Sequence, residues 1–89
     1  MNRRTALAHI RERGYLNRFS TMGDTWWCAH SVPGGEAEDA IEIPSNMALW
    51  LIQLGEVIPA GKGDDLAERD QCFISWFVPN PAKAKAAKS

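Results

Sequence analysis

The stretch TWWCAHSVPGGEAEDAIEI, residues 25–43, carries the pattern on which the predicted fold depends. Thr25 to Val32 is rich in aromatic and apolar residues and is typical of a strand, and Ala37 to Ile43 favours a second strand. Pro33-Gly34-Gly35 between them is typical of a turn, because these residues supply the backbone angles that turns require. The stretch therefore predicts an antiparallel strand pair.

Burial of apolar side chains decides the register of this pair. A three-residue loop would place the apolar residues of the first strand on the same face as three glutamates. A four-residue loop, Pro33 to Glu36, makes one face apolar, and a shift of one residue reverses every side chain. Its pairs are Val32 with Ala37, His30 with Asp39, Cys28 with Ile41 and Trp26 with Ile43. The four-residue loop is therefore predicted, and it turns Trp27 to the opposite face, across from Glu42. There Trp27 is either an exposed anchor for a partner or is covered by the first helix.

Two helices flank the strand pair in the prediction. Thr5 is placed to cap the first helix, and Gly14 to end it in the left-handed conformation. Leu16 and Phe19 continue the apolar signal, so a helix running to about residue 19 is the alternative. Ser45 is placed to cap a second helix that ends at Leu54-Gly55.

The C-terminal part alternates between turn signals and one strongly apolar run. Pro59 to Gly63 is predicted to be a loop, and the Asp65–Glu68 spacing favours a short helix over 65–70. Cys72 to Val78 is predicted to be a strand with apolar residues on both faces, which is typical of a central strand. Ala82 to Ser89 alternates Ala with Lys and predicts a flexible tail.

The predicted fold class is a small single α+β domain. Its element order is helix, strand, strand, helix, short helix, strand. The three-stranded, mainly antiparallel sheet carries the helices on one face. Residues 1–78 form the compact domain, and residues 79–89 form the flexible tail.

Composition and charge distribution narrow the function classes. The 89 residues have a net charge of −1, 45% hydrophobic and 24% charged residues, as in ordinary globular domains. Residues 1–20 contain five Arg and one Glu, whereas residues 21–71 contain ten acidic and two basic residues. A continuous basic face, the usual mark of a nucleic-acid binder, is not evident. The longest apolar run is too short to span a bilayer. We expect a cytoplasmic protein that needs no membrane and keeps Cys28 and Cys72 as thiols.

One cluster of residues has the chemical types needed for nucleophilic catalysis. Cys28, His30 and Asp39 share a face in the predicted register, but i and i+2 residues on a strand lie about 6.5–7 Å apart, too far for a thiol–imidazole hydrogen bond. A cross-strand His–Asp pair beside an apolar Cys is therefore favoured over an active site, and we predict no enzymatic activity. A zinc site from Cys28, His30, Cys72 and His9 would lack paired ligand spacing, so no metal and no cofactor is predicted.

The glycine-rich run Gly61-Lys62-Gly63-Asp64 lacks the spacing of a phosphate-binding P-loop. The predicted element order is similar to that of type II KH domains, in which a Gly-x-x-Gly loop between two helices binds a nucleic-acid backbone. That resemblance implies a small nucleic-acid-binding module as the alternative function. Asp64 stands where the second Gly of the loop would be, and Asp65 and Glu68 would also repel phosphates, so nucleic acid is expected to bind only weakly if at all. Its candidate residues are Arg3, Arg4, Arg11, Lys83 and Lys85.

Four tryptophans in 89 residues favour a protein-binding surface, because Trp is enriched at binding hot spots. The residues between Met47 and Leu54 are apolar nearly all round the helix, which indicates either a central place in the core or contact with a partner, including a second copy of the chain. The main prediction is a non-enzymatic module that occludes a surface on a larger protein or protein–nucleic acid complex. By analogy of size, it is similar to phage and mobile-element accessory proteins that inhibit host defence, such as anti-CRISPR proteins. The predicted partner-binding residues are Trp27, Glu36, Glu38, Glu42 and Trp50.

Overall fold

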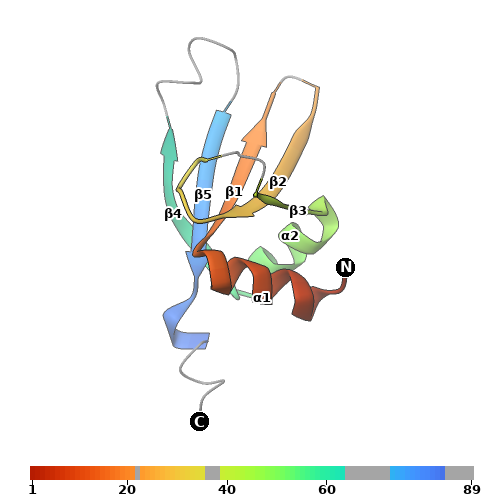
Figure 1. Ribbon diagram of the computed structural model, residues 1–89, viewed down its shortest axis with the longest axis vertical. Coiled ribbons are helices and arrows are strands. Elements are labelled where there is room, and N and C mark those ends of the chain that lie inside the picture. The colour runs from red at the N-terminus through yellow and green to blue at the C-terminus, as the bar shows by residue number, and fades with distance from the viewer. Residues whose placement is uncertain (22, 36–38, 64–72, 84–89) are drawn as a thin grey trace.

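The computed structural model describes residues 1–21, 23–35, 39–63 and 73–83. Its elements in chain order are α1 (Arg3–Arg13), β1 (Tyr15–Ser20), β2 (Thr25–His30), β3 (Ile41–Ile43), α2 (Ser45–Gln53), β4 (Val57–Gly63) and β5 (Phe73–Pro79). The strands form one antiparallel sheet in the order β3-β2-β1-β5-β4, and both helices gather at one end of it (Figure 1). The predicted α+β class is confirmed, but the predicted three strands are wrong, because the sheet has five.

Helix α1 begins and ends by local backbone chemistry. The side chain of Asn2 accepts a hydrogen bond from the Thr5 N–H at 2.8 Å, so Asn2 caps the helix. The prediction that Thr5 is the cap is wrong. Gly14 ends α1 with a φ of 112°, a left-handed angle that glycine adopts without strain. This stop confirms the predicted end and excludes the longer helix, because Tyr15 already belongs to β1.

Helix α2 lacks the predicted side-chain cap. Its N-cap residue is Pro44, no side chain caps the first turn, and Ser45 is the first helical residue. Gly55, with a φ of 75°, follows the C-cap residue Leu54 as predicted. Ala48 and Leu51 are fully buried. Leu51 thus attaches α2 to the core, while other apolar side chains of α2 remain outside.

Two strands were missed because their sequences resemble other structures. β1 contains two apolar residues that also fit a continued helix, and β4 contains Pro59, Gly61 and Gly63, which are loop signals. β4 lies at the edge of the sheet, where a proline's missing N–H costs no ladder hydrogen bond. The register also shifts between Pro59 and Gly61. β5 lies between β1 and β4, so its predicted interior position is confirmed. The predicted helix over 65–70 lies outside the described residues.

The two faces of the sheet are covered differently. On one face, side chains of α1 and α2 pack with Leu16, Trp27 and Ile43 in the main core. On the other face, Phe19, Cys28 and Ile74 form a second cluster, and Trp26 and Trp76 pack against it. Segment 31–35 lies over this second cluster, since a Cβ on Gly34 would stand 3.3 Å from Ile74 and from Trp76. Apolar residues are therefore buried on both faces.

Asn17 fixes segment 31–35 to the sheet. Its side chain is fully buried, and its amide group donates to the carbonyl oxygens of Val32 and Gly35, each at 2.9 Å. Its Oδ1 accepts from the Gly34 N–H at 3.0 Å. One side chain thus bonds to three backbone groups of the segment, and the Val32 oxygen also accepts from the Gly35 N–H at 2.9 Å.

The predicted register of β2 and β3 is wrong. Trp27 pairs with Ile43, and Cys28 pairs with Glu42, one position away from the four-residue-loop register. Consequently Trp27 is 3% exposed in the main core, on the helix side of the sheet. The prediction assumed that one face meets water, whereas segment 31–35 covers that face.

In the described part of the chain, the helices are all too short or too polar to cross a membrane.

Candidate binding surface on the two helices

The most exposed apolar side chains of α2 face away from the core. Leu49 is 56% exposed and Trp50 is 55% exposed, and Leu54, the C-cap residue that follows α2, is 41% exposed. Met47, Trp50 and Leu54 are spaced three and four residues apart, so they follow one stripe along the helix. A Trp left half in water keeps a large apolar area available for burial by a partner.

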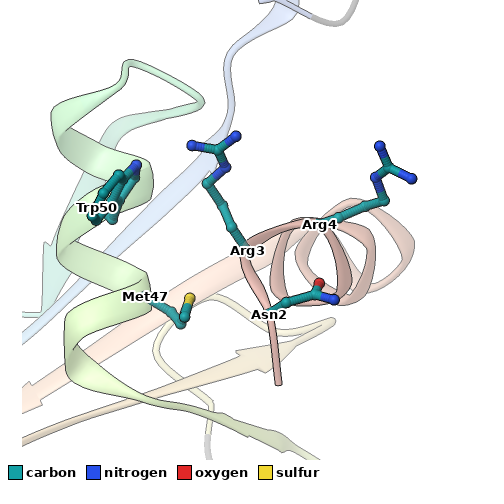
Figure 2. Close-up of a pocket in the computed structure, with 5 residues that line it drawn as sticks. All are labelled: Asn2, Arg3, Arg4, Met47 and Trp50. Carbon is teal, nitrogen blue, oxygen red and sulfur yellow. The ribbon is translucent and has the colours of Figure 1, made fainter.

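The start of α1 adds positive charge beside this stripe. Asn2, Arg3, Arg4, Met47 and Trp50 line a depression of about 300 Å³, which we call the α1–α2 surface. Figure 2 shows Met47 pointing from α2 towards α1 and Arg3 extending on the same side as Trp50. Arg4 extends away from Trp50 along the outside of α1 (Figure 2). The depression is therefore apolar on one wall and cationic on the other.

The arginines stand where helix electrostatics disfavours them. The first turn of α1 has no acidic residue and carries Arg3 and Arg4. A cation at the positive end of a helix dipole costs roughly 0.3–1 kcal/mol. No carboxylate of the described residues forms an ion pair with either arginine. Both guanidinium groups are thus available to an acidic ligand.

The other three residues predicted to bind nucleic acid, Arg11, Lys83 and Lys85, are not among the described residues that line the α1–α2 surface. Arg11 forms an ion pair with Glu56 at 3.6 Å, so part of its charge is already matched. The Cε of Lys83 lies 4.0 Å from the point where a Cβ on Gly55 would stand, next to the end of α2. Lys83 therefore adds a second cationic group near Leu54. Lys85 lies outside the described residues.

The structure joins residues that sequence reasoning had assigned to different sites. Trp50 was predicted to bind a protein partner, and Arg3 and Arg4 were predicted to bind nucleic acid. All three line the same depression. Asn2 and Met47 were missed, because an N-cap residue and a helical methionine have no sequence pattern that indicates a surface role.

The other predicted partner-binding residues do not join this surface. Trp27 is buried, so its predicted role as an exposed anchor is wrong in this structure. Glu42 is exposed on β3 and pairs with Cys28 on the sheet face away from the helices. Glu36 and Glu38 lie outside the described residues.

In the Cys28–His30–Asp39 cluster, both ring nitrogens of His30 form hydrogen bonds to groups other than the thiol. The Val32 N–H donates to Nδ1 of His30 at 3.0 Å, so the ring proton is on Nε2, which donates to Asp39 at 3.2 Å. The Sγ of Cys28 lies 3.7 Å from the carbonyl oxygen of Gly35. The predicted His30–Asp39 pair is therefore present, although the register that predicted it is wrong. Arg13 also contacts Asp39, at 3.9 Å.

The residues considered for a metal site and for a phosphate-binding loop also have defined outcomes in the structure. Within the described ranges, no group of three or more His, Cys, Asp and Glu side chains is close enough to hold a metal ion. Cys72 lies outside those ranges. Gly61 to Gly63 belong to β4 and not to a loop between helices, and the observed element order has three strands between α1 and α2. The predicted similarity to the type II KH element order is therefore wrong.

Comparisons with protein-family models, with curated proteins and with solved structures found no match.

Proposed function

We propose that this chain is a non-enzymatic protein-binding module, and that its docking surface is the α1–α2 surface. The observation that carries the proposal is Trp50, 55% exposed in a depression whose opposite wall carries Arg3 and Arg4. Trp and Arg are the residue types that most often dominate binding energy at interfaces.

Charge complementarity supports one class of partner. No carboxylate is among the described residues that line the depression, and α2 has no charged residue at all. An acidic protein segment with an apolar side chain would bury Trp50 while its carboxylates pair with Arg3 and Arg4 in bidentate geometry. Such a partner also offsets the unfavourable placement of both arginines at the start of α1.

A pair of designed peptides tests this partner class. The first is a helical peptide of about 15 residues with Leu at i, i+3 and i+7 and Glu elsewhere, and the second replaces every Glu by Lys. We expect the Glu peptide to bind, measured by fluorescence anisotropy, and the Lys peptide not to bind. Trp50→Ala should abolish binding, and Arg3→Gln should weaken it. Phe73→Ala, which removes an exposed aromatic side chain elsewhere, is the matched control and should bind normally.

Two outcomes would contradict the proposal. Equal binding of the Glu and Lys peptides would remove the role of the arginines. A chain that forms dimers by sedimentation equilibrium, and becomes monomeric on Trp50→Ala, would show that a second copy covers Trp50 in place of an acidic partner.

The finer predictions belong to this proposal. The partner is a larger protein or a protein–nucleic acid complex, and binding occludes one of its surfaces in the cytoplasm. Inhibition of a host defence system by a phage or mobile-element protein stays a prediction from analogy of size. It is tested by adding the purified chain to the isolated defence complex and measuring activity with and without Trp50→Ala.

A further inference from the structure

A second surface lies on the sheet at the end away from the helices. Arg18, Ser20, Lys62, Phe73 and Ser75, with Gly63 and Ile74, line a depression of about 410 Å³. We call it the distal sheet surface. It lies where β1 and β4 end and β5 begins, in a part of the sheet that extends beyond the helices (Figure 1). Among the residues that the structure describes, none that lines it is acidic.

The strand register places the polar groups of this surface on one face. Ser75 pairs with Arg18 on one side and with Lys62 on the other, so the three side chains form a row across β1, β5 and β4. Ser20 pairs with Phe73 in the next row. The backbones of Arg18 and Lys62 are two strand spacings apart, about 10 Å. Two cations and two hydroxyl groups thus face the same space.

Arg18 is held ready by the core beneath it. Its guanidinium carbon lies 5.7 Å from the ring centroid of the buried Trp27, a cation–π contact that restricts the side chain. Arg18 takes part in no ion pair with any described residue. A fixed guanidinium without a carboxylate partner is suited to bind a phosphate group.

Phe73 supplies a different kind of contact. It is 63% exposed, the highest value among the large apolar side chains that the structure describes. An exposed aromatic ring beside cations can stack on a nucleic-acid base while the cations bind the backbone. Stacking requires a base that is not already inside a duplex, which favours a single strand.

We propose that the distal sheet surface binds single-stranded nucleic acid without sequence preference. Arg18 and Lys62 contact successive parts of the phosphate backbone, Ser20 and Ser75 donate hydrogen bonds to it, and Phe73 stacks on one base. Of the described residues that line the depression, none is a buried polar side chain that could recognise a base edge, so sequence preference is not expected. This site is separate from the α1–α2 surface and does not depend on the proposed protein partner.

The test measures binding of the full chain to a fluorescein-labelled oligothymidylate of about 12 nucleotides, at about 50 mM salt, by fluorescence anisotropy. Phe73→Ala and Arg18→Gln should each weaken binding by about ten-fold. Phe73→Tyr keeps the ring and should restore binding. Trp50→Ala and Arg4→Gln are matched controls at the other end of the molecule and should bind as wild type.

Salt dependence and competition complete the test. With two phosphate contacts, the logarithm of the affinity should fall with the logarithm of salt concentration with a slope of about −1.4. Absence of binding at low salt would overturn the proposal, as would equal losses for Arg18→Gln and Arg4→Gln. Equally tight binding of the duplex would exclude base stacking on Phe73. If thymidine monophosphate displaces the labelled oligothymidylate as well as unlabelled oligothymidylate does at the same nucleotide concentration, the surface does not bind an extended strand.

Discussion

Replacement of Asn17 should destabilise the fold far more than an ordinary Asn→Ala substitution. Asn17 is fully buried and makes three hydrogen bonds to the backbone of segment 31–35. In Asn17→Ala, the carbonyl oxygens of Val32 and Gly35 and the N–H of Gly34 lose their bonds to the side chain, although the Val32 oxygen still accepts from the Gly35 N–H at 2.9 Å. The second face of the sheet then loses the contact that holds its cover in place.

The magnitude follows from the number of bonds. Each hydrogen bond contributes roughly 1 kcal/mol net, so Asn17→Ala should lower the free energy of unfolding by about 3 kcal/mol. A chain of this length has a total stability of roughly 4–13 kcal/mol, so the loss is a large part of it. Asn17→Asp keeps the acceptor for the Gly34 N–H but points a carboxylate oxygen at two carbonyl oxygens. It should therefore destabilise the fold at least as much as Asn17→Ala.

Urea unfolding followed by tryptophan fluorescence measures the effect. The midpoint should fall by about 1–3 M for Asn17→Ala. Asn80→Ala is the matched control, because Asn80 donates one 2.8 Å bond to Gly55 across elements and accepts one from nearby Ala82. Its loss should be about 1 kcal/mol.

A second readout separates release of segment 31–35 from general loss of stability. Cys28 is 6% exposed, and its Sγ lies 3.7 Å from the carbonyl oxygen of Gly35. In a Cys72→Ser background, Asn17→Ala should speed the reaction of Cys28 with Ellman's reagent under conditions where the chain stays folded. A urea midpoint within about 0.5 M of wild type, with an unchanged thiol rate, would refute the role assigned to Asn17.

For two further substitutions, the change in stability can be predicted from the contacts at the substituted residue. A Cβ on Gly61 would stand 2.7 Å from the indole ring of Trp76, so Gly61→Ala should cost roughly 1–3 kcal/mol in urea unfolding. Gly23→Ala meets nothing within 4 Å and should stay close to wild type, and an equal cost at both sites would contradict the proposed clash. Arg11→Gln removes a partly exposed ion pair with Glu56 and should shift stability by less than about 1 kcal/mol, a value that thermal unfolding can check.

The sequence predicted the elements with strong local signals and failed where long-range packing decides. Gly14 and Gly55 were identified as helix ends, because a left-handed residue after an apolar helix is a local feature. β4 was not identified, because Pro59 and Gly61 are compatible with a strand only at a sheet edge. That position depends on β5, which is distant in the sequence.

The register error has a single physical origin. Sequence alternation determines register when one face of a strand pair is apolar and the other meets water. In β2, Trp27 and Ala29 face the helices, while Cys28 and His30 face segment 31–35, so all four are buried. Alternation then carries no information about register. The buried amide of Asn17, which holds segment 31–35 in place, has no distinguishing pattern in the sequence.

The candidate site was predicted in part. Exposure of Trp50 was inferred from the apolar character of α2, and the positive charge of residues 1–20 was noted. The contact between the two required the packing of α1 beside α2, which no local pattern specifies. The structure therefore changed the proposed surface from an acidic segment with Trp27 to a cationic depression with Trp50.

The role of Trp50 in partner binding is the central claim, and affinity for a purified partner tests it most directly. A partner is captured from native-host extract with the wild-type chain, purified, and titrated by calorimetry against wild type, Trp50→Ala and Val32→Ala. Trp50→Ala should weaken binding by about 30-fold or more, the effect of a hot-spot residue. Val32 is 51% exposed and lines neither depression, so Val32→Ala should leave the affinity within about two-fold. Equal affinities for wild type and Trp50→Ala would contradict the account.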